Sequence, residues 1–227
     1  MGKWVLSSVT RPVDGASSED KSWWGVMSLI WLVVVGAFAY GAVFANGLAD
    51  LASFVGEKLG GFLDRLLGTQ QFADLGSQLL RSLALTQASV LFGRMLLAFL
   101  AALVLANLAV VVGGWLARRF VLGNARFGFL QAIDFYGRLA VVPGGLLLLA
   151  FVMAFFSTSG GIFFAGIAAI LWEFSVLFGV LAGENQRKGD TFWLKLLAFV
   201  ANAVILGVGN GIAGLVLGSA VRGILRQ

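Results

Sequence analysis

The chain contains no cysteine and no histidine among its 227 residues, and it has only two prolines. Thiolates and imidazoles are the usual ligands of zinc, and they supply the nucleophile or the general base of many hydrolases. Their absence excludes disulfides, the usual zinc sites and most hydrolase mechanisms. We therefore expect no metal, no cofactor and no enzymatic activity.

Charge is also scarce. Charged residues make up 12% of the chain and hydrophobic residues 59%, whereas roughly a quarter of the residues of a soluble domain are charged. The mean hydropathy is +0.95, which is typical of a membrane protein. The net charge of +5 arises from Lys and Arg between apolar runs, where lipid headgroups attract them. The bilayer, and not nucleic acid, is the expected partner.

The long apolar runs predict an all-α, polytopic transmembrane helix bundle of about five spans. We expect a disordered cytoplasmic tail at 1–22 and one transmembrane domain at 23–227. The first run is about 22 residues long, against roughly 7–15 for the apolar core of a signal peptide, which favours an uncleaved span. The predicted spans are 24–45, 95–116, 139–156, 162–182 and 192–220.

The connection between the first two spans has an amphipathic pattern over residues 47–83. Apolar residues from Leu48 to Leu66 recur every three or four positions, with charged residues on the opposite side. This pattern predicts a helix, broken at Gly68 and resumed to Leu83. Two interpretations remain open: a pair of helices packed over the outer face of the bundle, or a surface that docks a partner.

Basic residues favour a cytoplasmic N-terminus and an external C-terminus, as in a bacterial inner membrane. With that orientation, Lys58, Arg65, Arg81, Arg94, Arg222 and Arg226 lie outside. Ten lie on or near the cytoplasmic side, namely Lys3, Arg11, Lys21, Arg118, Arg119, Arg126, Arg138, Arg187, Lys188 and Lys195.

Glu173 is the one carboxylate inside the predicted fourth span. Glu173, Asn107 and Asn202 all lie about 15 Å from the cytoplasmic interface, so these three side chains are predicted to meet. One interpretation is a protonatable site on an ion or solute path. The other is a structural hydrogen bond between Glu173 and an Asn.

The last span is rich in glycine. Gly207 and Gly211, like Gly214 and Gly218, are four residues apart, so they predict a close-packing face within the fold or between subunits. Gly209–Gly214 also matches the dinucleotide motif G-x-G-x-x-G. That motif requires a preceding strand and an aqueous phosphate site, so no dinucleotide is expected here.

The segment before the third span carries a second group of candidates. Asn124 is the predicted cap of a short helix. Asp134 and Arg138 are four residues apart on it, so they are predicted to pair on one face. Asp134, Tyr136 and Arg138 are predicted to lie near the inner interface, where they are candidate contacts for a lipid headgroup. An enzyme acting on lipid is the least favoured of three functional hypotheses.

The segment NARFGFLQAIDFYGRLAVVPGG, with Tyr136-Gly137 ahead of Pro143, resembles the Yip/Yif (Rab-interacting) superfamily of five-span membrane proteins. The resemblance covers roughly residues 90–220, and it lacks the family's Gly-Tyr-Ser element and its Cys-rich zinc ribbon. It implies a non-enzymatic scaffold or adaptor, with a second copy or another membrane protein as partner. The alternative is a small ion or solute transporter or channel that uses Glu173.

Overall fold

The structure is a computed structural model that describes residues 2–10, 23–68, 71–184 and 186–225; the side chains of 85–91, 94, 224 and 225 are not described. The described residues form helices and turns, with no strand among them, which confirms the all-α prediction. The helices are α1 (Gly2–Thr10), α2 (Trp24–Leu67), α3 (Phe72–Leu116), the π-helical turn η2 (Ala117–Val121), α4 (Phe129–Leu139), α5 (Val141–Ala154), α6 (Thr158–Leu181) and α7 (Thr191–Leu225).

Four of these helices are long and apolar enough to cross a membrane: Trp24–Leu67, Met95–Val121, Thr158–Leu181 and Thr191–Gly223. The short helices α4 and α5, bent by 46° at Ala140, together qualify as a fifth crossing. Pro143 lies in the first turn of α5, where an N–H has no helical partner to lose. The chain thus has the length and composition of a four- or five-span protein.

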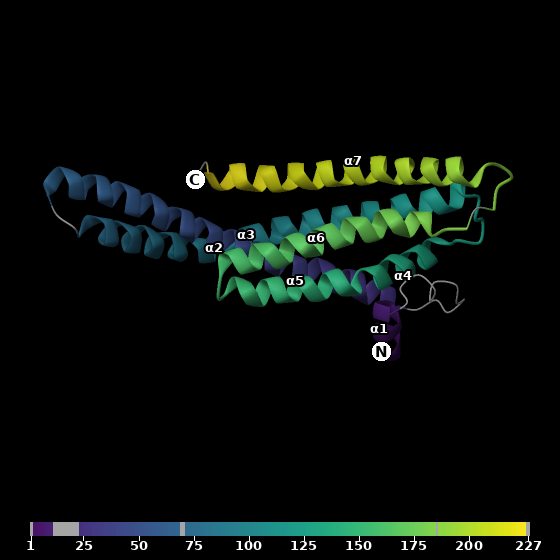
Figure 1. The fold of residues 1–227 in the computed structure, drawn as a ribbon, viewed down its shortest axis with the longest axis horizontal. Helices are drawn as coiled ribbons and strands as arrows, with labels where there is room; N and C mark the ends of the chain where they lie inside the picture. Colours follow the sequence, from purple (N-terminus) through teal and green to yellow (C-terminus); the bar gives the residue numbers. More distant parts are fainter. Residues whose placement is uncertain (1, 11–22, 69–70, 185, 226–227) are drawn as a thin grey trace.

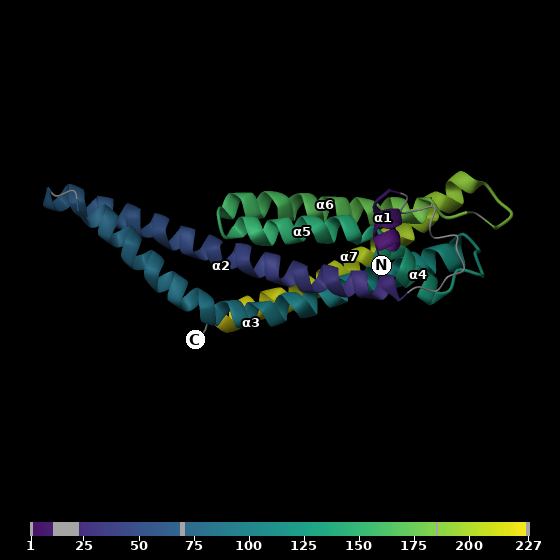
Figure 2. The ribbon, with the colours of Figure 1, turned by 90° about the horizontal axis from the view of Figure 1, so that it is seen from below.

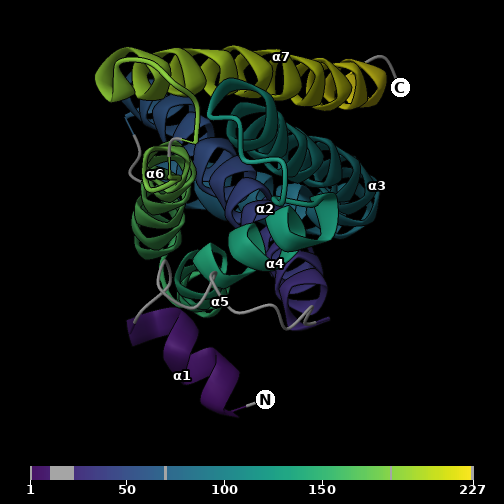
Figure 3. The same ribbon diagram turned by 90° about the vertical axis from the view of Figure 1, so that its right-hand side faces the viewer.

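The central helix of the bundle is α2, which packs against α3, α4, α5 and α6 (Figure 3). On the other side of α3, α7 covers that helix and also touches α6. The C-terminus lies towards the end where α5 turns into α6, and α1 lies at the α4 end (Figure 1). Successive long helices therefore run back and forth along one axis.

Side chains cap two of the helices. Ser157 Oγ accepts a hydrogen bond from the Gly160 N–H at 3.2 Å at the start of α6, and Asp190 Oδ1 accepts one from the Phe192 N–H at 2.8 Å at the start of α7. The predicted Asn124 cap is wrong. Helix α4 begins at Phe129 after Gly128, whose N–H donates to Gln131 Oε1 at 2.9 Å.

The predicted tail at 1–22 is partly wrong, because Gly2–Thr10 forms helix α1 against α4 and α5. Residues 11–22 lie outside the described residues. Two side-chain hydrogen bonds stabilise this helix. The hydroxyls of Ser7 and Ser8 both donate to the Trp4 carbonyl at 2.8 Å. Ser8 is the buried residue of α1.

The first and second spans each continue without a break into the amphipathic segment, so α2 has 44 residues and α3 has 45. Residues 50–67 of α2 and 72–84 of α3 form a hairpin, here called the arm, which extends beyond the α5–α6 turn (Figures 1 and 2). Its tip is at Gly68, which ends α2 with φ of 65° and so confirms the predicted break. The interpretation that this segment packs over the bundle is wrong.

Candidate functional site

Glu173 lies in the middle of α6 and accepts a hydrogen bond from Asn210 Nδ2 of α7 at 3.3 Å. Both residues line a cavity of about 130 Å³ together with Asn107 of α3 and Tyr40 of α2. The structure thus brings Glu173 and Asn107 to the same cavity, as the common depth suggested. The Asn107 amide donates to the Leu103 carbonyl of its own helix at 2.8 Å and does not bind Glu173.

Asn202 is placed elsewhere. Its side chain is fully buried (0% exposed) against Gly113 of α3, and neither of its polar atoms has a hydrogen-bond partner. The amide partner of Glu173 is therefore Asn210, which sequence reasoning missed. The sequence signal for Asn210 was its place as a polar residue between Gly209 and Gly211. That signal was weak, because apolar residues occur on every side of α7 and do not show which way Asn210 faces.

The glycines predicted to pack helices do not do so within the described part of the chain. A Cβ added to Gly207, Gly211, Gly214 or Gly218 would meet no atom within 4 Å. Gly209 is the glycine of α7 that faces a neighbour, because a Cβ there would overlap the Cβ of Ala109 on α3. These four glycines therefore lie on an outward face of α7.

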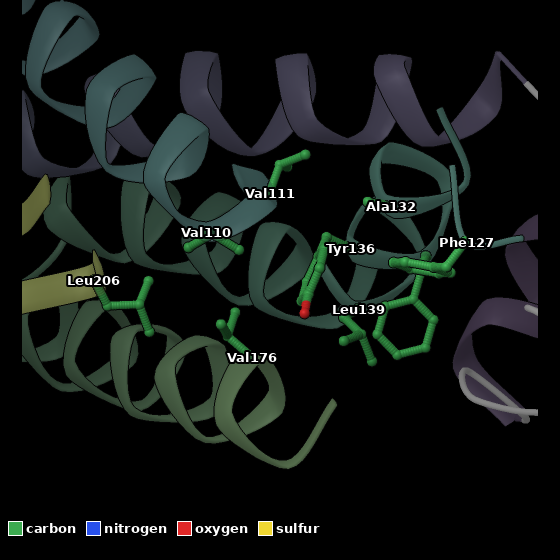
Figure 4. Close-up of a cluster of buried hydrophobic side chains, with 9 residues drawn as sticks. Val110, Val111, Phe127, Ala132, Tyr136, Leu139, Val176 and Leu206 are labelled. Atoms are coloured by element: carbon green, nitrogen blue, oxygen red, sulfur yellow. The ribbon is translucent and has the colours of Figure 1, made fainter. Parts of the chain in front are cut away.

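The candidate headgroup residues are buried under the bundle. Tyr136 is 0% exposed and belongs to the buried cluster shown in Figure 4. A Cβ on Gly114 of α3 would overlap the Tyr136 hydroxyl and ring. Asp134 Oδ2 and Arg138 Nε form an ion pair at 3.0 Å, confirming the predicted pairing on one helix face. Trp4 of α1 lies over the Arg138 guanidinium at 5.5 Å. The expectation that these side chains meet a lipid headgroup is wrong, because α1 and the bundle cover them.

Arg118 was expected to mark the membrane interface, yet it is buried in η2. Its Nη2 donates to the carbonyl of Gly179 near the end of α6. Its guanidinium lies 3.9 Å from the Phe135 ring centre and 4.9 Å from that of Phe127. The cation therefore ties η2 to the carbonyl end of α6 and to the aromatic core beside α4.

Glycines also hold α2 against α4. A Cβ on Gly137 would overlap backbone atoms of Gly25, and a Cβ on Gly25 would overlap Asp134 Cα. The Tyr136-Gly137 pair thus has a packing role: the ring fits beneath Gly114 while the glycine allows two backbones to touch.

The arm is also built on glycine. A Cβ on Gly56 would overlap the Gly76 carbonyl, and one on Gly60 would overlap the Phe72 carbonyl. At the tip, the Asp64 carboxylate accepts hydrogen bonds from Phe72 N–H and Ala73 N–H, both at 2.9 Å. Large apolar side chains are left outside this seam; the exposed ones are Leu51, Phe54, Val55, Leu59, Phe62, Leu63, Leu66, Leu67, Phe72, Leu75, Leu79 and Leu83.

The fold and these contacts define an all-helical membrane-type bundle with a projecting hairpin. Within that class, the sequence model of DUF6574, a domain of unknown function, matches residues 82–222. That is more than half of the 227 residues, so the chain belongs to the DUF6574 family. The match leaves out α1, α2 and nearly all of the arm.

No curated protein and no solved structure matches the chain. Nothing in these comparisons links it to the Yip/Yif superfamily, so that resemblance stays a prediction.

Proposed function

We propose that the protein is a non-enzymatic membrane scaffold or adaptor that binds its partner through the arm. The observation that carries the proposal is the arm's construction, with glycines between its helices and large apolar side chains outside. Leu66 is 65% exposed and Phe62 60% exposed. Exposed apolar patches of this extent mark sites of protein or membrane interaction.

Length supports a partner outside the bilayer. A helix of 44 residues is about 66 Å long, about twice the thickness of the hydrocarbon core of roughly 30 Å. With α5 and α6 inside that core, the arm extends into water. Its apolar surface then favours association, because burial releases about 25 cal/mol for each Å².

A second copy of the chain is the partner that the arm's charge favours. The arm carries four acidic residues, Asp50, Glu57, Asp64 and Asp74, and three basic ones, Lys58, Arg65 and Arg81, a net charge of −1. Two such arms repel each other little and offer charges of both signs to one another.

The proposed location is a bacterial inner membrane, with the N-terminus in the cytoplasm and the arm and C-terminus outside. Support comes from the α4 end of the molecule, where the segment from η2 through α4 meets the end of α6 and the start of α7 (Figure 1). These segments contain seven basic residues: Arg118, Arg119, Arg126, Arg138, Arg187, Lys188 and Lys195.

Single cysteines test this proposal cleanly, because the chain has none of its own. Leu66→Cys places a thiol on the exposed arm, and Leu148→Cys places one on the exposed face of α5. We expect oxidation of native membranes to give disulfide-linked dimers for Leu66→Cys and none for Leu148→Cys. A monomer in both cases would contradict association of two arms.

A single cysteine also tests on which side of the membrane the arm lies. Gln78 is an exposed polar residue of the arm. A membrane-impermeant maleimide added to intact cells should label Gln78→Cys. Labelling only after the cells are broken would place the arm in the cytoplasm and overturn the proposed orientation.

A small transporter or channel is the second candidate, and the cavity at Glu173 is the observation that favours it. A cavity of about 130 Å³ has room for about four water molecules. Glu173 is the only carboxylate that lines it, beside the neutral Asn107, Asn210 and Tyr40. A single carboxylate among neutral side chains fits an interhelical hydrogen bond better than a chain of proton-transferring groups.

A further inference from the structure

A second and larger cavity lies at the base of the arm, between α2, α3 and the α5–α6 turn. Its volume is about 760 Å³, within the usual range of small-molecule sites of roughly 300–1,000 Å³. The cavity is separate from the one at Glu173, since the two have no lining residue in common.

One wall of this cavity is aromatic. The rings of Phe38 and Phe92 have centres 6.3 Å apart, and those of Phe38 and Phe151 are 5.9 Å apart. These side chains come from α2, α3 and α5 and lie on the bundle side of the cavity. An acyl chain suits these three rings, which offer no hydrogen-bonding group.

The opposite side is polar and carries charges of both signs. Asp50 of α2 and Arg81 of α3 both line the cavity, together with the hydroxyl residues of the α5–α6 turn, Ser157, Thr158 and Ser159. Neither charged side chain forms an ion pair within the described part of the chain, where the pair found joins Asp134 to Arg138. The cavity therefore presents one unpaired carboxylate and one unpaired guanidinium.

The depth of the cavity matches the boundary of a bilayer. Phe155 and Phe156, at the turn between α5 and α6, are 70% and 81% exposed, and the hydroxyl residues Ser157–Ser159 follow them directly. This change from apolar to polar residues places the turn where the hydrocarbon layer ends. The Phe38 side of the cavity then faces the acyl layer, while Asp50 and Arg81 lie at the headgroup level or just beyond it.

We infer that this cavity binds a phospholipid whose headgroup combines a phosphate with a primary amine. Arg81 and the Ser/Thr hydroxyls bind the phosphate, since guanidinium and hydroxyl donors suit its oxygens. The Asp50 carboxylate accepts hydrogen bonds from the ammonium group, and the aromatic wall holds an acyl chain. A headgroup with the phosphate alone leaves Asp50 facing like charge.

Native mass spectrometry of the full chain, titrated with defined lipids, tests this inference. We expect dioleoylphosphatidylethanolamine to bind about tenfold more tightly than dioleoylphosphatidylglycerol or dioleoylphosphatidylcholine, the difference of one charge-assisted contact. Asp50→Asn should remove the preference for ethanolamine, and Arg81→Gln should weaken binding of all three lipids about tenfold. Glycerophosphoethanolamine, which has the headgroup without acyl chains, should not compete at lipid concentrations.

Matched controls are available on the arm. Asp74→Asn and Arg65→Gln make the same chemical changes at residues that do not line the cavity, and both should bind lipid as the parent chain does. Equal binding of the three lipids by the parent chain would overturn the inference without recourse to any variant. The inference would also be overturned if the control variants lost as much lipid binding as Asp50→Asn and Arg81→Gln. Competition by glycerophosphoethanolamine would overturn the assignment to a lipid.

Discussion

In both the arm and the α4 end of the bundle, glycines allow two helix backbones to touch. The large side chains beside those glycines are exposed in the arm and buried at the α4 end. At the α4 end, Gly25 and Gly137 let two backbones touch, and the neighbouring Tyr136 is buried. In the arm, Gly60 lies against the Phe72 backbone, while neighbouring Leu59 and Phe62 are exposed. The first arrangement completes a core, and the second leaves a surface to be covered.

The comparison shows that a glycine seam by itself does not identify a buried region. Close backbone contact brings two helices together, but the apolar side chains beside the seam decide what else must associate. At the α4 end these side chains belong to a cluster with Phe127, Phe135 and Val176. On the arm they have no such cluster within the described chain.

Breaking the bundle seam should have the largest effect. Gly137→Ala places a Cβ onto the backbone of Gly25, so α4 and α2 must separate. We expect a loss of about 3 kcal/mol in the free energy of unfolding, as for a severely overpacked core. Denaturant titration in detergent micelles measures it.

The control for that change is Gly145→Ala on α5, where an added Cβ meets nothing within 4 Å. Its stability should match the parent chain or exceed it by up to about 1 kcal/mol, because Ala favours helix over Gly. An equal loss in the two variants would mean that the contact between Gly25 and Gly137 does not hold α4.

Helix α7 offers the next test. Gly209→Ala should cost about 2 kcal/mol, since its Cβ overlaps that of Ala109. Gly211→Ala, one half-turn away, meets no atom, so the unfolding free energy of the monomer should stay unchanged or rise by up to about 1 kcal/mol, as for Gly145→Ala. Thermal unfolding followed by circular dichroism distinguishes them, and the reverse order would place the other face of α7 against α3.

Breaking the arm seam should have a smaller and more local effect. Gly60→Ala places a Cβ onto the Phe72 carbonyl, whereas the adjacent Gly61→Ala meets nothing within 4 Å. We expect Gly60→Ala to cost about 1 kcal/mol and to separate the arm helices without unfolding the bundle. Distances between spin labels on the arm and on the bundle report each change; a loss of bundle structure would contradict the independence of the arm.

The smallest expected effect is that of Glu173→Gln. A Gln still accepts the hydrogen bond from Asn210, so stability should change by less than about 1 kcal/mol. Arm-mediated dimers should persist as well. Proteoliposome flux that depends on Glu173 and disappears in Glu173→Gln would favour the transporter instead.

Much of the fold follows from hydropathy and spacing. The apolar runs predict α5, α6 and α7 to within a few residues, whereas α2 and α3 each extend more than 20 residues beyond the predicted spans. The Asp134–Arg138 pair follows from its spacing of four. The arm's periodicity correctly predicts two helices with a break at Gly68. The periodicity does not show what packs against each face of these helices, because an apolar stripe carries no information about what covers it.

The details of the site required the structure for a related reason. In α7 apolar and glycine residues occur on every side, so neither Asn202 nor Asn210 is marked as facing α6. Depth alone placed Asn202 beside Glu173, but Glu173 bonds Asn210, which is eight residues and about 12 Å further along α7. Asn202 lies against Gly113 of α3 instead. The arm seam did have a signal, Gly56 and Gly60 at a spacing of four, and the stronger Leu and Phe pattern masked it.

The central claim is that the apolar surface of the arm binds another copy of the chain. Native mass spectrometry of protein released directly from membranes tests it by counting chains, with Phe62→Ser/Leu66→Ser/Leu75→Ser/Leu79→Ser compared with the parent and with Gln78→Ala. We expect two or more copies for the parent and for Gln78→Ala, and a single, equally stable copy for the four-serine variant. A single copy for the parent, or assembly unchanged by the four serines, would contradict the claim.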